Sequence, residues 1–231
     1  MKTIGLIGGM SWESTVPYYR QINELIKERL GGLHSAKLVL FSVDFHEIEQ
    51  LQHAGEWQKA GDILAQAAMA LERAGADGLI ICTNTMHKVA GQVQAAVALP
   101  LLHIADPTAD AIKAAGFGKV GLLGTRFTME QDFYRLRLER DHGLEVLIPD
   151  EDDREVIHNV IYQELCLGVV RDDSREAYSR VIDRLVAQGA QAIILGCTEI
   201  SLLIGPADAP VPLFDTTAIH AAHAAHWALG S

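Results

Sequence analysis

Two short polar segments of this 231-residue chain follow apolar runs and carry groups that can move protons. Residues 82–85 read Cys-Thr-Asn-Thr after "GLII", and residues 197–199 read Cys-Thr-Glu after "AIILG". A thiol has a reference pKa near 8.5 and can be tuned to act as a base, whereas a threonine hydroxyl needs a strong base beside it. The pattern favours a catalytic thiol at Cys197, with a buried structural cysteine as the alternative.

An internal repeat connects the two segments. "RAGADGLIICTNT" resembles "AQGAQAIILGCTE", and aligning Gly75 with Gly189 at an offset of 114 places Thr83 opposite Cys197. "KTIGLIGGMSWESTVPYYR" resembles "GKVGLLGTRFTMEQDFYR" at an offset of 116. Ligands of open parallel sheets bind beyond the carboxyl ends of the strands. If both halves turn those ends toward one cleft, Thr83 and Cys197 face a ligand from opposite sides.

The elements that position these segments alternate along the chain. Continuous apolar runs separated by helical patterns predict parallel sheets covered on both faces. We therefore predict an α/β protein with two pseudo-symmetric four-stranded parallel-sheet domains and an active site in the cleft between them. The runs taken as strands are "TIGLIG", "AKLVLFSV", "GLIIC", "PLLHI", "KVGLLG", "LEVLI", "QAIILG" and "VPLF".

The polar residues around the two segments each have a structural alternative. Thr83 could simply end a strand or cap a helix, and Cys82 beside it is predicted to face the core because adjacent strand residues point to opposite faces. A helix is predicted to begin at Thr198. Four polar residues could hold an α-carboxylate or cap helices, and the two roles are compatible: Asn84, Thr85, Thr198 and Glu199. The loop residues predicted to line the cleft are Met10, Ser11, Thr125 and Thr128.

Several histidines and one further cysteine also admit two interpretations. His87 could support the site from behind Thr83 or be a satisfied core histidine. His220, His223 and His226 have a spacing that drifts around a helix, so a partly exposed helix face is favoured over a zinc site. Cys166 follows Glu164, which could reach the cleft, but Cys166 is predicted to be core.

Composition excludes several classes of function. The formal net charge of −11 argues against nucleic acid and anionic membranes as partners. Three widely spaced cysteines indicate neither a disulfide framework nor a zinc site. The first apolar run is too short for a signal peptide, and no apolar stretch approaches a bilayer span. These features predict a cytoplasmic protein without a metal.

Four segments together resemble the aspartate/glutamate racemase family, the cofactor-independent group that includes glutamate racemase, hydantoin racemase and arylmalonate decarboxylase. They are "IGLIGGMSWEST", "CTNTMHK", "GTRFTMEQDFY" and "GCTEI", and the first two are similar to the enterobacterial-type branch specific for L-aspartate and L-glutamate. The resemblance implies one domain over 1–115, completed by a C-terminal helix over 216–231, and a second over 116–215. It also implies a homodimer, a small amino-acid substrate and no cofactor.

The family's mechanism uses two cysteines on opposite faces of the substrate Cα, one as thiolate base and one as thiol acid. The carry-over lands on Thr83 and Cys197 as catalytic residues, and this chain departs from the family by having threonine at 83. A racemase of acidic or small polar amino acids is the leading hypothesis, with Cys197 as the competent base. A single-cysteine lyase of the arylmalonate decarboxylase type and a non-catalytic amino-acid-binding protein are the alternatives. Residues carried over as substrate contacts are Met10, Gln52, Asn84, Thr85, Thr125, Thr198 and Glu199, and Arg126 and Lys88 are candidates for an acidic side chain.

Overall fold

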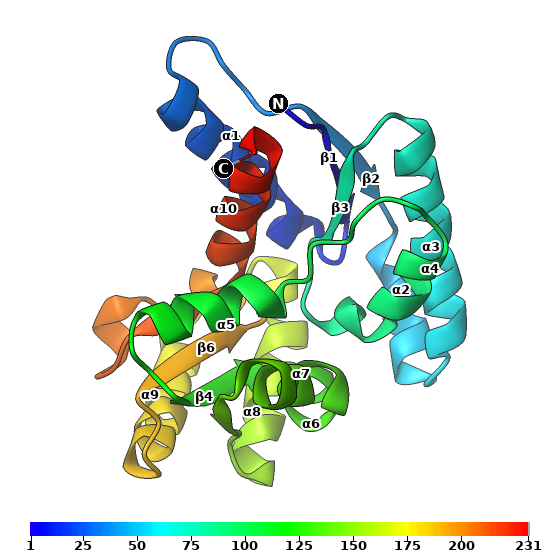
Figure 1. Ribbon diagram of the computed structural model, residues 1–231. Coiled ribbons are helices and arrows are strands. Elements are labelled where there is room, and N and C mark those ends of the chain that lie inside the picture. The colour runs from blue at the N-terminus through cyan, green and yellow to red at the C-terminus, as the bar shows by residue number, and fades with distance from the viewer. Residues whose placement is uncertain (231) are drawn as a thin grey trace. The chain divides into compact units, whose positions relative to one another are not determined.

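The computed structural model describes residues 1–230, which divide into two compact units. Unit 1 is Met1–Ile104 together with the C-terminal segment from His220, and unit 2 is Ala105–Ile219 (Figure 1). The chain therefore passes from unit 1 to unit 2 after Ile104 and returns after Ile219. Each unit is built around its own parallel sheet.

Unit 1 contains a parallel sheet of order β2-β1-β3. Ile4 in the central strand pairs with Leu38 on one side and with Gly78 on the other. The elements are β1 (Ile4–Gly8), α1 (Trp12–Leu30), β2 (Leu38–Ser42), α2 (Phe45–His53), α3 (Trp57–Arg73), β3 (Gly78–Ile81), the 3-10 helix η1 (Thr85–Val89), α4 (Ala90–Ala95) and most of α10 (Thr216–Leu229).

The prediction of a fourth strand in this sheet is wrong. "PLLHI" contributes a single parallel bridge, Leu101 to Leu79, held by two hydrogen bonds: Leu79 N–H donates to the carbonyl of Pro100 and Leu102 N–H donates to that of Leu79, both at 2.9 Å. The segment is too short to form a strand, because helix α5 (Ala105–Ala114) begins directly after Ile104.

Helices cover both faces of the unit 1 sheet. Alternate strand residues point to opposite faces. On one face Ile7, Leu79 and Ile81 pack against α3, whose buried Ala60, Leu64, Ala67, Ala68 and Leu71 form the apolar stripe of an amphipathic helix. On the other face Ile4, Leu6, Ile80 and Cys82 pack against α1 and α10 (Figure 1). The contact surface of α10 is mostly alanine, which allows the helix to lie close to the sheet.

Unit 2 contains a four-stranded parallel sheet of order β5-β4-β6-β7. Its central strands β4 and β6 pair from Val120 with Ala192 to Gly124 with Gly196. Its elements are α5, β4 (Lys119–Gly124), α6 (Arg126–Glu130), α7 (Asp132–His142), β5 (Glu145–Leu147), α8 (Glu151–Gln163), η2 (Leu165–Leu167), α9 (Asp172–Ala187), β6 (Ala192–Gly196), η3 (Ile200–Leu202), η4 (Pro206–Asp208) and β7 (Leu213–Asp215).

The division between the units lies about ten residues before the domain boundary expected from the sequence, so helix α5 belongs to unit 2. The cause is a contact between α5 and α7. Arg137 donates two hydrogen bonds to the Asp106 carboxylate, from Nε to Oδ1 at 2.6 Å and from Nη2 to Oδ2 at 2.8 Å. His142 Nε2 lies 3.1 Å from the same Oδ1. A planar two-point contact of this kind fixes orientation as well as distance.

The two units repeat one backbone design. Gly75 after α3 and Gly189 after α9 both have positive φ, 88° and 99°, which L side chains rarely adopt. A Cβ at Gly5 in β1 would lie 2.7 Å from Leu79 Cδ2, and one at Gly121 in β4 would lie 2.6 Å from Ile193 Cδ1. The internal repeat predicted from the sequence is therefore present in the structure.

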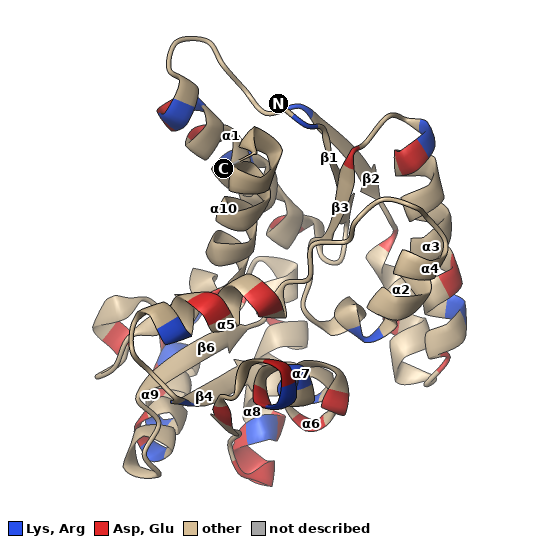
Figure 2. Cartoon of the chain, viewed as in Figure 1, with Lys and Arg blue, Asp and Glu red and all other residues tan. Residues whose placement is uncertain are grey.

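Most charged residues lie on the helices and loops, and strands β1, β3 and β6 carry none (Figure 2). These strands are buried along their whole lengths. None of the helices in residues 1–230 combines the length and apolar composition needed to cross a membrane.

Candidate active site

The carboxyl end of β6 presents a thiol beside a carboxylate. Cys197 is 7% exposed and its Sγ–H donates to Oε2 of Glu199 at 3.0 Å. Thr198 Oγ1 donates to the same oxygen at 2.7 Å. Two donors therefore converge on one buried carboxylate oxygen, and the three residues form one polar group.

Gly196 makes this arrangement possible. A Cβ at this position would lie 2.8 Å from the carbonyl oxygen of Leu123 and 2.7 Å from Leu122 Cδ1. Glycine thus lets β4 and β6 approach closely at the point where both strands end. Because Gly124 pairs with Gly196, Thr125 and Cys197 follow paired strand residues at one edge of the sheet.

The electrostatics of this group keep the thiol protonated. Burial raises the pKa of Cys197 well above its ordinary value, and the charges of Glu199 and Cys166 raise it further. A second anion beside the Glu199 carboxylate would be repelled in this buried site, so the protonated form of the thiol is favoured.

The carboxyl end of β3 presents hydroxyl and amide groups instead. Thr83 is 8% exposed, Asn84 is buried in the bend that leads into η1, and Thr85 is the buried first residue of η1. The Thr83 carbonyl accepts a hydrogen bond from His87 Nδ1 at 2.7 Å. Cys82 is buried in the core with Ile80, and burial raises the pKa of its thiol, as expected for a core cysteine.

Met10 and Gln52 lie with the β3 end in unit 1. Met10 is buried in the cluster that contains Ile48 and Met86. Gln52 Nε2 donates to Met86 Sδ at 3.1 Å, and Met10 belongs to the same buried cluster as Met86, a residue that was not predicted as part of the site. "CTNTMHK" contains Met86, but nothing in its sequence spacing marked it as a neighbour of Gln52.

Thr125 is the N-cap of α6. Its Oγ1 accepts from the N–H of Thr128 at 3.2 Å and lies 3.2 Å from the Thr128 hydroxyl. The hydroxyl of Thr125 is therefore engaged by the helix start, which is the capping alternative for such residues.

The prediction of a helix that begins at Thr198 is wrong, because the chain forms only the short 3-10 helix η3 before Gly205 and Pro206. After β3 the chain likewise enters η1 rather than a long α-helix. Each strand end is therefore followed by a 3-10 helix and not directly by an α-helix. Backbone N–H groups of these turns and the polar side chains beside them are groups that can interact with an anion.

The two candidate cations for an acidic side chain have other contacts. Lys88 Nζ lies 3.9 Å from the centroid of the Trp57 ring, and burial lowers its pKa. Arg126 Nε lies 3.9 Å from Glu130 Oε1, and the Arg126 N–H donates to His158 Nδ1 at 3.2 Å.

The remaining histidines and Cys166 differ in burial. His220 is fully buried, whereas His223 and His226 are exposed, so the three lie on a helix that is exposed only in part, as expected. Cys166 is half-exposed rather than core, because Leu165 takes the buried position of η2. No group of three or more His, Cys, Asp or Glu side chains within residues 1–230 is arranged to hold a metal ion.

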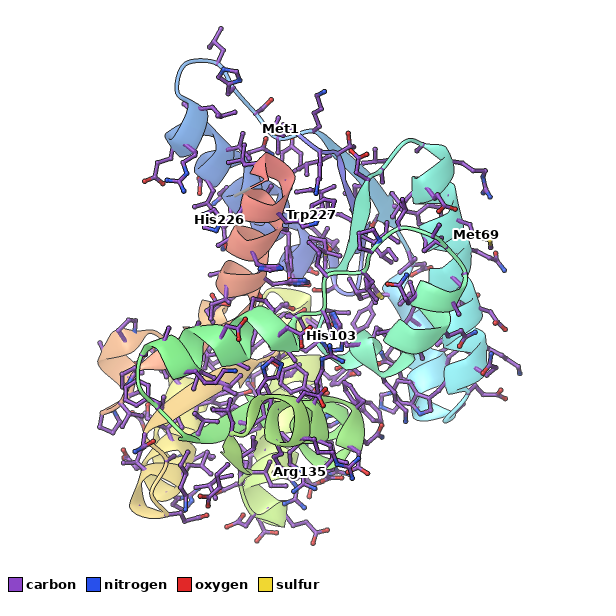
Figure 3. All side chains as sticks on the ribbon, viewed as in Figure 1. Met1, Met69, His103, Arg135, His226 and Trp227 are labelled. Atoms are coloured by element: carbon purple, nitrogen blue, oxygen red, sulfur yellow. The ribbon has the colours of Figure 1, made fainter. Side chains whose placement is uncertain are left out.

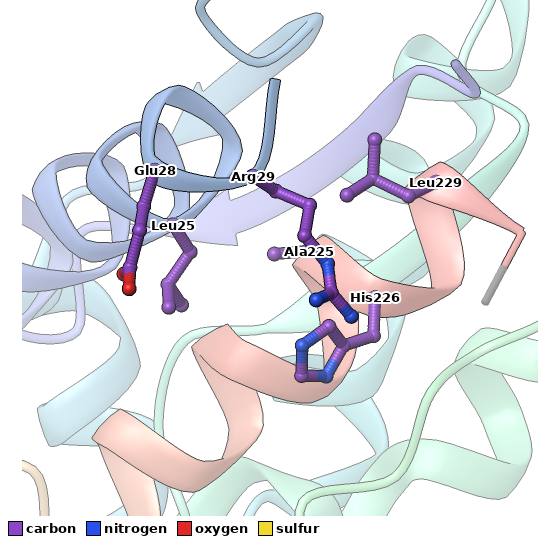
Figure 4. Close-up of a pocket in the computed structure, with 6 residues that line it drawn as sticks. All are labelled: Leu25, Glu28, Arg29, Ala225, His226 and Leu229. Carbon is purple, nitrogen blue, oxygen red and sulfur yellow. The ribbon is translucent and has the colours of Figure 1, made fainter. Parts of the chain in front are cut away.

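A separate surface groove of about 270 Å³ lies between α1 and α10 in unit 1 (Figure 4). It is not lined by the predicted site residues. The lining residues are Leu25, Glu28, Arg29, Ala225, His226 and Leu229.

Unit 2 thus brings Cys197, Thr198, Glu199 and Thr125 to one sheet edge, and unit 1 brings Thr83, Asn84, Thr85, Met10 and Gln52 to another. Residues 7–224 match the family model described as Asp/Glu/Hydantoin racemase. The chain belongs to this family, and the membership supports a racemase.

Known relatives agree with this assignment. The chain is 63% identical to a Yersinia pestis protein solved as a candidate Asp/Glu racemase, with a TM-score of 0.92 over 99% of this chain and 100% of that one. It is 37% identical to an aspartate racemase homologue from Pyrococcus horikoshii, with a TM-score of 0.85 over 99% and 100% of the two chains. It is 23% identical over 93% of both chains to the broad-specificity amino-acid racemase RacX of Bacillus subtilis. These similarities support an amino-acid racemase with two parallel sheets.

Proposed function

We propose that the protein interconverts the enantiomers of aspartate, glutamate or a related small polar amino acid without pyridoxal phosphate. The observation that carries the proposal is the Cys197–Glu199 contact of 3.0 Å at the position that the internal repeat matches with Thr83. Cys197 is the acid–base thiol, and Thr83 acts on the opposite face of the substrate Cα.

The Cys197–Glu199 pair supplies a base without stabilising a second anion. Transfer of the thiol proton to the Glu199 carboxylate gives a thiolate and a carboxylic acid at constant net charge. The thiolate then takes the α-proton, so that the pair becomes neutral while the substrate becomes a carbanion. The raised pKa of the resting thiol is compatible with this step, because the developing product is the favoured protonated thiol.

The carbanion needs donors around the substrate carboxylate. We assign this role to the polar groups after the two strand ends, Asn84, Thr85 and Thr198. Each preorganised donor in such a site is worth on the order of 3 kcal/mol. Met10, Gln52 and Thr125 are proposed to border the substrate, with Lys88 or Arg126 meeting an acidic side chain.

Thr83 makes the two faces unequal. Its hydroxyl can donate a hydrogen bond or relay a proton with water, but it is a poor base at neutral pH. Return of a proton from that face is therefore the slow half of racemisation. Removal of a proton from that face is slow for the same reason.

The test is a panel of L- and D-amino acids incubated with the purified protein in D₂O and scored for α-deuterium by mass spectrometry. We expect deuteration of aspartate or glutamate that survives hydroxylamine treatment and dialysis, which would remove pyridoxal phosphate. Binding without deuterium incorporation would indicate a non-catalytic amino-acid-binding protein. Release of CO₂ from an aryl-malonate would indicate the lyase instead.

We further propose a homodimer, on the basis of the family resemblance. Light scattering after size exclusion measures the mass directly. A single 25.2 kDa species at micromolar concentration would contradict it.

A further inference from the structure

Three histidines of unit 1 lie together near the carboxyl end of β3. His87 comes from η1, His103 from the segment before α5 (labelled in Figure 3), and His220 from α10. The centroid of the His87 ring lies 4.5 Å from that of His103 and 5.9 Å from that of His220. His87 and His220 are buried, so their hydrogen bonds determine which ring nitrogens carry protons.

The partners of His87 fix its protonation state. The N–H of Ile104 donates to His87 Nε2 at 3.2 Å, so this nitrogen carries no proton. Nδ1 lies 2.7 Å from the carbonyl oxygen of Thr83, which can only accept, so Nδ1 carries the proton. Both hydrogen bonds exist together only in the neutral Nδ1–H form of the ring.

His220 has the opposite arrangement. Its Nε2 donates to the carbonyl of Leu102 at 2.9 Å, and its Nδ1 lies 2.9 Å from the hydroxyl of Tyr18. A neutral Nε2–H ring satisfies both contacts, with the phenol as donor. The two imidazoles therefore bind neighbouring residues of one segment, His87 through a backbone N–H and His220 through a backbone carbonyl.

This segment is where the chain leaves unit 1. Ile104 is the last residue of unit 1 before α5, and His220 is the first residue of unit 1 on the return. Thr83, at the other side of His87, begins the polar segment proposed to face the substrate. One ring thus connects the end of β3 to the chain crossing at Ile104.

We propose that His87 is a positioning residue for Thr83, Asn84 and Thr85. Its Nδ1–H holds the Thr83 carbonyl, and its Nε2 is held in turn by the Ile104 N–H. The polar segment keeps its conformation because the ring is fixed at both nitrogens. This inference rests on the proposed racemase function only for its catalytic consequence, since the hydrogen bonds themselves do not depend on the reaction.

Two substitutions separate the two hydrogen bonds. In His87→Asn the amide nitrogen occupies the place of Nδ1 and keeps the bond to Thr83, whereas the acceptor for Ile104 is lost. In His87→Gln the longer side chain places its amide oxygen near the position of Nε2 and loses the bond to Thr83. Small displacements of reacting groups can cost up to about 10²-fold in rate. We expect kcat for α-proton exchange to fall about tenfold in His87→Gln and less than about threefold in His87→Asn.

The matched control is His226→Gln, which changes an exposed histidine on α10 and is expected to leave kcat unchanged. Equal kcat for wild type and His87→Gln, with both folded by circular dichroism, would overturn the positioning role. So would equal losses in the Asn and Gln variants, because general destabilisation does not distinguish the two nitrogens.

Two further measurements do not require activity. Long-range ¹H–¹⁵N spectra of the wild type near pH 7 should show His87 protonated at Nδ1 alone and His220 at Nε2 alone. Hydrogen exchange should show a faster Ile104 amide in His87→Asn, while the Leu102 amide, bonded to Leu79, keeps its protection. An Nε2–H or doubly protonated His87 would overturn the inference. If the wild type exchanges no amino acid, the racemase proposal fails while these two measurements still decide on the His87 bonds.

Discussion

The two strand ends of this protein share a backbone design and differ in chemistry. Both follow the last residue of a buried parallel strand, and both precede a 3-10 helix. The β6 end carries a thiol that is hydrogen-bonded to Glu199. The β3 end carries Thr83, whose carbonyl accepts a hydrogen bond from His87. The same backbone design therefore carries different side-chain chemistry in the two units, because strand pairing sets the position of each strand end independently of the side chains that follow it.

The largest effect should come from removing the thiol. Cys197→Ala removes the thiol that we propose as the base of the reaction. A positioned base contributes about 10²–10⁴-fold, so we expect α-deuteration of both enantiomers to fall by about 10³-fold. Retention of more than a tenth of the wild-type rate would contradict the assignment.

Glu199→Gln should have the next largest effect. It should separate the role of Glu199 as acceptor of the thiol proton from the effect of its charge on the pKa of Cys197. The amide cannot accept the thiol proton as a carboxylate does, and we expect a loss of about 10²-fold in exchange. Because the charge of Glu199 raises the pKa of Cys197, the same variant should lower that pKa. The pH dependence of Cys197 alkylation, measured with Cys82 and Cys166 replaced, checks this; an unchanged or higher thiol pKa would count against the pair.

Thr83→Cys should make the two strand ends chemically alike. A second thiol at the repeat-related position supplies a base on the other face. We expect the slower enantiomer to gain at least about tenfold in α-exchange, with a smaller change for the faster one. Thr83→Ser is the matched control, because it keeps a hydroxyl of similar reach and should give no gain. No gain for the cysteine variant would show that Thr83 does not face the substrate.

Cys82→Ala should have the smallest effect on catalysis. Cys82 lies in the core beside Thr83, and we expect exchange per folded molecule to remain within about twofold. The cavity should lower the free energy of unfolding by about 1–2 kcal/mol, measured by urea titration. A large loss of exchange with little loss of stability would identify Cys82 as the thiol at this end.

The same variant tests the burial of the Cys82 thiol through the pH dependence of the free energy of unfolding. Burial raises the pKa of the native thiol, while the unfolded chain releases this proton near pH 8.5. The contribution of the buried, protonated Cys82 thiol to the free energy of unfolding is therefore complete below about pH 8.5. Above that pH it declines by up to about 1.4 kcal/mol per pH unit. Between about pH 8.5 and 10 the free energy of unfolding should fall less steeply in Cys82→Ala than in the wild type. Parallel slopes would mean that the thiol is accessible.

The sequence predicted the central strands of both sheets and the strand ends that carry the site, because these depend on local signals. Apolar runs, flanking glycines and the repeat all lie within short segments. The absence of a fourth strand in unit 1 could not be predicted, since the reduction of "PLLHI" to a single bridge depends on where the chain leaves for unit 2. The burial of His220 depends on Tyr18, which is 202 positions away.

The boundary between the units and the Ile104 partner of His87 depend on distant residues for the same reason. Asp106 and Arg137 are 31 positions apart, and their bidentate contact assigns α5 to unit 2. His87 and Ile104 are 17 positions apart, and no periodicity marks the pair. The Cys197–Glu199 contact is local, but the sequence pattern predicts Glu199 as a substrate contact and does not indicate its hydrogen bond to the thiol.

The central claim is that the two faces of the site differ in their ability to remove a proton. The direct measurement is the initial rate of α-deuterium incorporation without inversion, from pure L- and pure D-substrate in D₂O. Equilibrium ties the two racemisation efficiencies together, so racemisation rates alone do not report the asymmetry. We predict that one enantiomer, the one whose α-proton faces Cys197, exchanges at least about tenfold faster than it inverts, and that the other exchanges no faster than it inverts. Rapid exchange of both enantiomers that survives Cys197→Ala would contradict the account.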